Sequence, residues 1–232
     1  MTIDEIVRLT EAAAKLLSVL AWPAVLVFVL VHFGPAIREF LSNLSEFSLK
    51  GAGFEASAKR KQAEAAAALT AAAVSRPEPG ATPESTAREA KAAFDVVAEV
   101  ATPSVIRRAE RSTALWVDDV PSNNVHERAA LEALGVTIVL AKSTDEALEK
   151  LKRQRFDVII SDMGRLGDPE AGYTLLDALR STGDRTPFII YAGSRATEHR
   201  AEARRRGAVG CTNRPDELFE MVLSAVGRRR AA

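Results

Sequence analysis

The sequence predicts an α/β protein with a five-stranded, doubly wound parallel sheet over residues 112–232. Strand-like and helical patterns alternate five times in this part of the chain, which is typical of a parallel sheet covered by helices. The strand patterns are short continuous apolar runs, as expected for strands buried on both faces. An uncharged apolar run over residues 16–37 predicts, in addition, an N-terminal transmembrane helix, followed by a helical stalk.

Residues 1–37 are predicted to form a membrane anchor. The segment from Leu16 to Ile37 contains no charged residue, and a helix of about 22 residues spans roughly 33 Å, enough to cross a hydrocarbon core of about 30 Å. A cleaved signal peptide is disfavoured because acidic residues occupy the expected basic start; a buried soluble helix is a further alternative. Two basic residues precede the span and five follow it before residue 62. The positive-inside rule therefore predicts a single-pass protein of the inner (cytoplasmic) membrane, with the α/β domain in the cytoplasm.

The segment between the anchor and the α/β domain is predicted to contain several short elements. Within residues 38–74, a hairpin is predicted over 47–56, where two alternating runs flank a glycine-containing turn. The segment continues as an alanine-rich helix over 58–74, which lacks large apolar residues and is interpreted as a stalk. An isolated hairpin is barely stable, which favours contact with the membrane or a homo-oligomer. Residues 75–86 are a proline-containing linker, and residues 87–111 a connecting helix that Thr102-Pro103 interrupts.

The five βα units then follow in order. We expect strands over 115–119, 136–140, 157–161, 188–191 and 208–211, and helices over 127–134, 144–153, 173–180, 196–205 and 215–226. Gly135 and Gly183 stand where the first and third helices end, a position that favours glycine. Strands joined in this way by helices pair in parallel with right-handed crossovers, which places helices on both faces of the sheet.

Three acidic residues follow two of these strands. Asp118 and Asp119 come at the end of the first strand, and Asp162 follows the third. Because the carboxyl ends of parallel strands meet at one edge of a sheet, we expect the three side chains to face a common crevice. Close carboxylates repel one another, so the cluster favours a hard divalent cation such as Mg²⁺. The alternative is that Asp118 and Asp119 only cap the turn into the next helix.

Four motifs occur in a characteristic order: Val117-Asp118-Asp119-Val120-Pro121 with Asn124, Phe156 to Met163, Thr186-Pro187-Phe188-Ile189-Ile190, and Gly207-Ala208 before Arg214-Pro215. In these motifs the chain from Thr113 to Gly227 resembles the receiver domains of two-component response regulators, which have a flavodoxin-like fold. The resemblance implies that Asp162 accepts a phosphoryl group. It also implies that Asp118, Asp119, Asp162 and the Gly164 carbonyl bind Mg²⁺, and that a histidine kinase or another phosphodonor is a partner.

Several positions depart from the pattern of that family. Receivers usually carry Thr or Ser after the fourth strand, lysine before the final proline and an aromatic residue in the fifth strand. The corresponding residues here are Ala192, Arg214 and Cys211. We expect Arg214 and Arg165 to supply positive charge that faces the phosphoryl group, with Ser194 able to replace the hydroxyl if its loop is rearranged. The alternative is that both arginines are ordinary solvated surface residues.

Composition and motifs narrow the possible functions to three. Lysine plus arginine and aspartate plus glutamate number 31 each, and no helix-turn-helix follows the α/β domain, so no nucleic-acid partner is predicted. The first interpretation is a membrane-anchored signalling protein that takes up phosphate on Asp162. The second is a pseudo-receiver that acts as a phosphorylation-independent interaction or oligomerisation module. The third is an enzyme on a related fold, which is least favoured because no general base lies beside a substrate loop; we therefore do not expect an enzyme.

Overall fold

The computed structural model describes residues 52–75, 80–192 and 197–227. The described residues from Ser57 onward form one compact unit. The predicted membrane span over residues 16–37 and the candidate site residue Ser194 lie outside the described residues. Within the described ranges, no helix combines the length and the apolar character needed to cross a bilayer.

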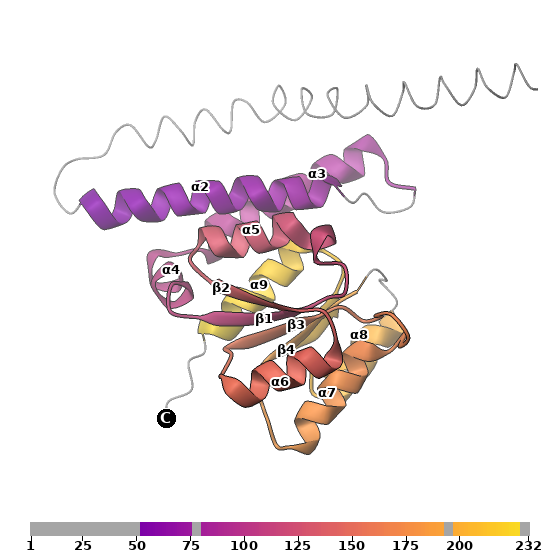
Figure 1. Ribbon diagram of the computed structural model, residues 1–232. Coiled ribbons are helices and arrows are strands. Elements are labelled where there is room, and N and C mark those ends of the chain that lie inside the picture. Colours follow the sequence, from indigo (N-terminus) through magenta and orange to yellow (C-terminus); the bar gives the residue numbers. More distant parts are fainter. Residues whose placement is uncertain (1–51, 76–79, 193–196, 228–232) are drawn as a thin grey trace, which may run out of the picture. The chain divides into compact units, whose positions relative to one another are not determined.

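The α/β domain contains a five-stranded parallel sheet with the strand order β2-β1-β3-β4-β5 (Figure 1). Its strands are β1 (Thr113–Val117), β2 (Thr137–Ala141), β3 (Val158–Ser161), β4 (Phe188–Tyr191) and β5 (Gly210–Thr212). The helices between and after them are η1 (Pro121–Asn124), α5 (Val125–Ala133), α6 (Thr144–Arg153), α7 (Ala171–Ser181), α8 (Thr197–Arg205) and α9 (Pro215–Gly227). The predicted series of five βα units is confirmed, with boundaries that differ by about two residues.

Both faces of the sheet are covered by helices, with α5 and α9 on one face and α6, α7 and α8 on the other (Figure 1). Alternate residues of each strand enter the two cores. Trp116 and Ile160 pack with α5 and α9, whereas Leu115, Val117 and Ile159 pack with α6 and α7. The strands are therefore buried on both sides, which explains their continuous apolar runs.

Two further helices, α2 (Ala52–Ser75) and α3 (Pro83–Val100), pack on the face formed by α5 and α9 (Figure 1). Leu69 and several alanines of α2 belong to the same core as Val97 of α3 and Leu131 of α5. The alanine-rich helix is therefore not a free stalk. Its small side chains let the helices approach closely, and burial does not require large apolar residues.

The start of α2 corrects the predicted hairpin over residues 47–56. Residues 52–56 form the first turns of α2, so the second arm of the hairpin is wrong, and the first arm lies outside the described residues. The linker is also shorter than predicted, because α2 continues to Ser75 and α3 begins at Pro83. The Thr82 side chain accepts a hydrogen bond from the Ser85 N–H, and this capping interaction fixes the beginning of α3.

The predicted connecting helix over residues 87–111 is two helices, α3 and α4 (Pro103–Ala109). Pro103 has no N–H with which to continue α3. The Thr102 hydroxyl accepts a hydrogen bond from the Val105 N–H and caps a new helix. As a result the chain changes direction before β1, and α4 packs beside α9 through Ile106 and Val226.

Candidate functional site

The three predicted acidic residues meet at the carboxyl edge of the sheet. Val117, the last residue of β1, is paired with Ser161, the last residue of β3. Asp118 and Asp162 directly follow these two residues, so both lie side by side at the carboxyl end of neighbouring strands. One carboxylate oxygen from each of Asp118, Asp119 and Asp162 lies within 4.8 Å of the other two. The possible ligand atoms are therefore all carboxylate oxygens, which are the ligands that Mg²⁺ prefers.

The loop after β1 holds Asp118 in place. Its carboxylate is buried and accepts hydrogen bonds from the Val120 N–H, at 2.8 Å, and from the Asn124 side-chain amide. Asp118 therefore stabilises the turn after β1, as the alternative interpretation expects. However, helix α5 has no side-chain cap, so neither Asp118 nor Asp119 acts as its N-cap.

The loop between β3 and α7 holds the other two acids. The Asp162 carboxylate accepts a hydrogen bond from the Met163 N–H at 2.7 Å, and the Asp119 carboxylate accepts one from the Leu166 N–H at 2.9 Å. Gly172 lies so close to this loop that a Cβ atom there would be 2.9 Å from the Asp162 carbonyl oxygen. Both acids are only half buried, so their remaining lone pairs are accessible to a cation.

The carboxylates of the site influence one another electrostatically. Burial raises the pKa of Asp162, and the negative charges of Asp118 and Asp119 raise it further, against the opposing hydrogen bond from Met163. A bound divalent cation would relieve this repulsion and favour the ionised carboxylates. The residues present therefore fit the metal that the sequence predicts.

Residues 114–223 match the family model of the response regulator receiver domain. This part of the chain is a response regulator receiver domain. A search among curated proteins finds no match.

Several solved structures are similar to the receiver domain. The receiver domain of the Francisella response regulator 1452 is 26% identical, with 51% of this chain and 99% of that chain covered and a TM-score of 0.47. The chemotaxis response regulator CheY4 of Vibrio cholerae is 27% identical, with 49% and 98% covered and a TM-score of 0.44. The response regulator TrrA from Thermotoga maritima, in complex with Mg²⁺ and BeF, is 23% identical, with 49% and 98% covered and a TM-score of 0.43.

Arg165 of the receiver domain is directed inward. Its side chain is 8% exposed, and its guanidinium donates hydrogen bonds to Ser161 Oγ, Thr144 Oγ1 and the carbonyl oxygens of Ala171 and Asp162, at 2.7 to 3.0 Å. Burial lowers the pKa of Arg165, although nearby carboxylates oppose this. The guanidinium forms no ion pair with the three acids, and its role as a charge that faces the phosphoryl group stays a prediction. Arg165 fixes the loop that carries Asp162.

Arg214 of the receiver domain also has partners of its own. Its Nε donates to Asp216 at 3.0 Å and lies 3.7 Å from Glu217, and the hydrogen bond to Asp216 raises the pKa of Arg214. The guanidinium therefore pairs with the first turn of α9. Ala192, where receivers usually carry a hydroxyl, is buried at the end of β4. Gly164 lies in the loop after Asp162, and its role as a carbonyl ligand stays a prediction.

One buried polar pair, formed by Tyr191 and Glu127, was not predicted from the sequence. The Tyr191 hydroxyl donates a hydrogen bond to the Glu127 carboxylate at 2.9 Å, and the Tyr191 ring meets Trp116 edge-on at a centroid distance of 6.1 Å. Glu127 is 3% exposed. Its spacing from Ala130 and Leu131 on the apolar face of α5 was the signal that it points inward.

Replacing Tyr191 by phenylalanine should destabilise the protein by about 1–3 kcal/mol, because the buried Glu127 carboxylate loses a hydrogen bond. Urea denaturation monitored by circular dichroism measures this difference. Tyr173→Phe is the matched control, since its hydroxyl donates to the His199 carbonyl in a partly buried position. An equal loss in both variants would contradict the importance of the Glu127 contact.

Proposed function

We propose that the receiver domain binds Mg²⁺ through Asp118, Asp119 and Asp162 and accepts a phosphoryl group on Asp162. A histidine kinase or another phosphodonor would supply this group. The convergence of the three carboxylates within 4.8 Å is the observation that carries this proposal. The protein would then act as a signalling switch, and not as an enzyme that turns over a separate substrate.

Each residue of the site has a separate role in the proposed phosphoryl transfer. An Asp162 carboxylate oxygen attacks the phosphorus atom of the donor, and the bond to the leaving group breaks as the acyl phosphate forms. Asp118 and Asp119 would hold the cation, which would supply charge neutralisation at the transferring oxygens when bound. The Asn124 amide keeps the Asp118 carboxylate in place. Asp162 itself is held by the Met163 N–H on one oxygen, Oδ1.

Incubation of the full-length protein with acetyl phosphate and Mg²⁺ tests the proposal. We expect intact-mass spectrometry to show one added phosphoryl group, which is lost in Asp162→Asn and when Mg²⁺ is chelated. Asp145→Asn is the matched control, because Asp145 is exposed in the first turn of α6. An adduct that persists in Asp162→Asn would place the phosphoacceptor elsewhere.

A pseudo-receiver is the second candidate, and three observations favour it. Ala192 offers no hydroxyl to a phosphoryl group, Arg165 is directed inward, and Arg214 is paired with Asp216. In that case the same fold would act as an interaction module. Binding of Mg²⁺ without any phosphoryl adduct, from acetyl phosphate or from a kinase, would support this second function over the first.

We also propose that residues 16–37 anchor the protein in the inner membrane, with the receiver domain in the cytoplasm. The uncharged apolar run and the basic residues after it support this proposal. The protein should sediment with membranes and resist extraction by alkaline carbonate, whereas a variant that lacks residues 16–37 should appear in the supernatant. Release of the intact protein by carbonate would contradict anchoring.

A further inference from the structure

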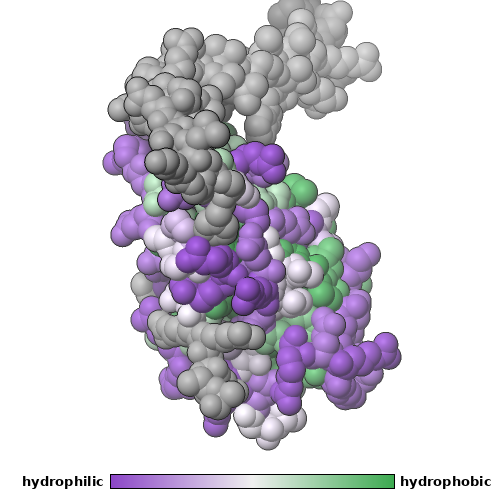
Figure 2. Space-filling view, turned by 90° about the vertical axis from the view of Figure 1, so that its left-hand side faces the viewer, coloured by the Kyte–Doolittle hydropathy of each residue, from purple (hydrophilic) through white to green (hydrophobic). Residues whose placement is uncertain are grey.

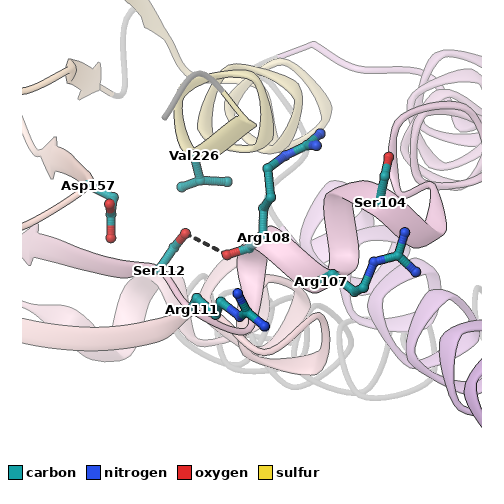
Figure 3. Close-up of a pocket in the computed structure, with 7 residues that line it drawn as sticks. All are labelled: Ser104, Arg107, Arg108, Arg111, Ser112, Asp157 and Val226. Carbon is teal, nitrogen blue, oxygen red and sulfur yellow. Dashed lines mark hydrogen bonds between the residues drawn. The ribbon is translucent and has the colours of Figure 1, made fainter. Parts of the chain in front are cut away.

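A second candidate binding site lies at the edge of the sheet opposite the acid cluster. A cavity of about 360 Å³ opens between α4 and the end of α9 (Figure 3). Ser112 directly precedes β1 and Asp157 directly precedes β3, whereas the acids follow these same strands. The cavity is lined by Ser104, Arg107, Arg108, Arg111, Ser112, Asp157 and Val226. Its position separates it from the Mg²⁺ and phosphoryl site.

Positive charge dominates the lining of the cavity. Three arginines and a single acidic residue, Asp157, line the cavity, and the Asp157 carboxylate already accepts a hydrogen bond from the Thr113 N–H at 2.8 Å. Within the part of the chain that the structure describes, no acidic side chain forms an ion pair with Arg108 or Arg111. The face that carries α4 is turned to the viewer in Figure 2, where strongly hydrophilic residues gather at the centre.

Arg108 supplies a second, independent sign of a missing partner. Its side chain runs toward α9 (Figure 3), and its Nε is buried without a hydrogen-bond acceptor. A buried N–H without an acceptor costs free energy that an added oxygen ligand would recover. Arg107 and Arg108 also lie in the last turn of α4, where they balance the helix dipole. The dipole explains neither the orphaned Nε nor Arg111, which lies beyond the helix.

We propose that this cavity binds the phosphate groups of a small ligand that carries at least two negative charges. Guanidinium groups match phosphate oxygens in pairs, and several together favour a multiply charged phosphate over a single carboxylate. The volume lies at the lower end of the range for small-molecule sites, which suits a diphosphate or triphosphate group. A soluble polyphosphate and a phosphorylated lipid headgroup share this chemistry.

Isothermal titration calorimetry of the full-length protein with inorganic pyrophosphate and tripolyphosphate tests the proposal. A chelator is present, so that phosphate cannot bind through Mg²⁺ at Asp162. The double variant Arg107→Gln, Arg111→Gln should bind at least about tenfold more weakly, since two charge-assisted hydrogen bonds are lost. The control Arg185→Gln, Arg204→Gln removes two exposed charges elsewhere and should bind like the unchanged protein.

Liposome flotation distinguishes the two sources of phosphate. Vesicles of phosphatidylcholine with phosphatidic acid are compared with phosphatidylcholine alone, using the same two double variants in a chain without residues 16–37 and the same chain otherwise unchanged. Flotation that needs phosphatidic acid and is lost only in the Arg107, Arg111 variant identifies a lipid headgroup, whereas soluble phosphate binding without flotation identifies a free ligand. Circular dichroism verifies that the variants fold. Equal weakening in both double variants, or binding of neither probe by the unchanged protein, overturns the proposal.

Discussion

Replacing Asp118 by asparagine is expected to weaken Mg²⁺ binding by about a hundredfold or more, because loss of an outer-sphere partner alone typically costs 10–100-fold. Asparagine retains the size of the side chain but removes one of the three negative charges that converge at the site. It also disturbs the hydrogen bonds from Val120 and Asn124. Phosphorylation of Asp162, which depends on the cation in our proposal, should fall with the affinity.

Trp116 fluorescence measures this effect in a full-length chain that carries Trp22→Phe. Trp116 is then the only tryptophan; it lies two residues before Asp118 and contacts the ring of Tyr191. The Mg²⁺ titration should shift in Asp118→Asn and stay unchanged in Asp145→Asn. An Mg²⁺ affinity that is unchanged in Asp118→Asn would show that the cation does not bind at the acid cluster, and would contradict the proposed site.

The fold of the α/β domain was predictable because its periodicities are strong. Runs such as residues 158–160 are apolar at every position, since both faces of β3 are buried. Helix α4 was not predicted, because Thr102-Pro103 was interpreted only as a break. The same dipeptide is also a start signal, with threonine as N-cap and proline as first helical residue. The packing of α2 was missed because alanine contributes through close approach and not through size.

The candidate site was predictable in position but not in the direction of every side chain. The acids follow directly from strand ends and parallel pairing. Arg165 takes its orientation from Thr144 and from Ala171, and no local pattern connects these residues. Arg214, in contrast, pairs with Asp216 two residues further along. That local charge pair was a signal that its guanidinium is engaged beside α9.

Replacing Arg165 by methionine should destabilise the metal-free protein by roughly 1–3 kcal/mol, the usual cost of leaving buried hydrogen-bonding groups without their partner. The hydroxyl of Thr144 and the carbonyl of Ala171 would lose their donor. In addition, Asp162 and Asp119 would lose the stabilising positive charge that lies nearby. Urea denaturation in the presence of a chelator measures the change, and Arg153→Met, on the exposed end of α6, should cost less than about 0.5 kcal/mol.

The response to Mg²⁺ separates the two contributions of Arg165. A cation at the acid cluster would replace the charge compensation but not the hydrogen bonds to the loop, so Mg²⁺ should recover only part of the lost stability. Full recovery would mean that charge alone explains the role of Arg165, and no recovery would mean that the loop between β3 and α7 has lost the geometry that binds the cation. Because the Leu166 N–H in this loop donates to Asp119, we expect the remaining Mg²⁺ affinity to be reduced as well.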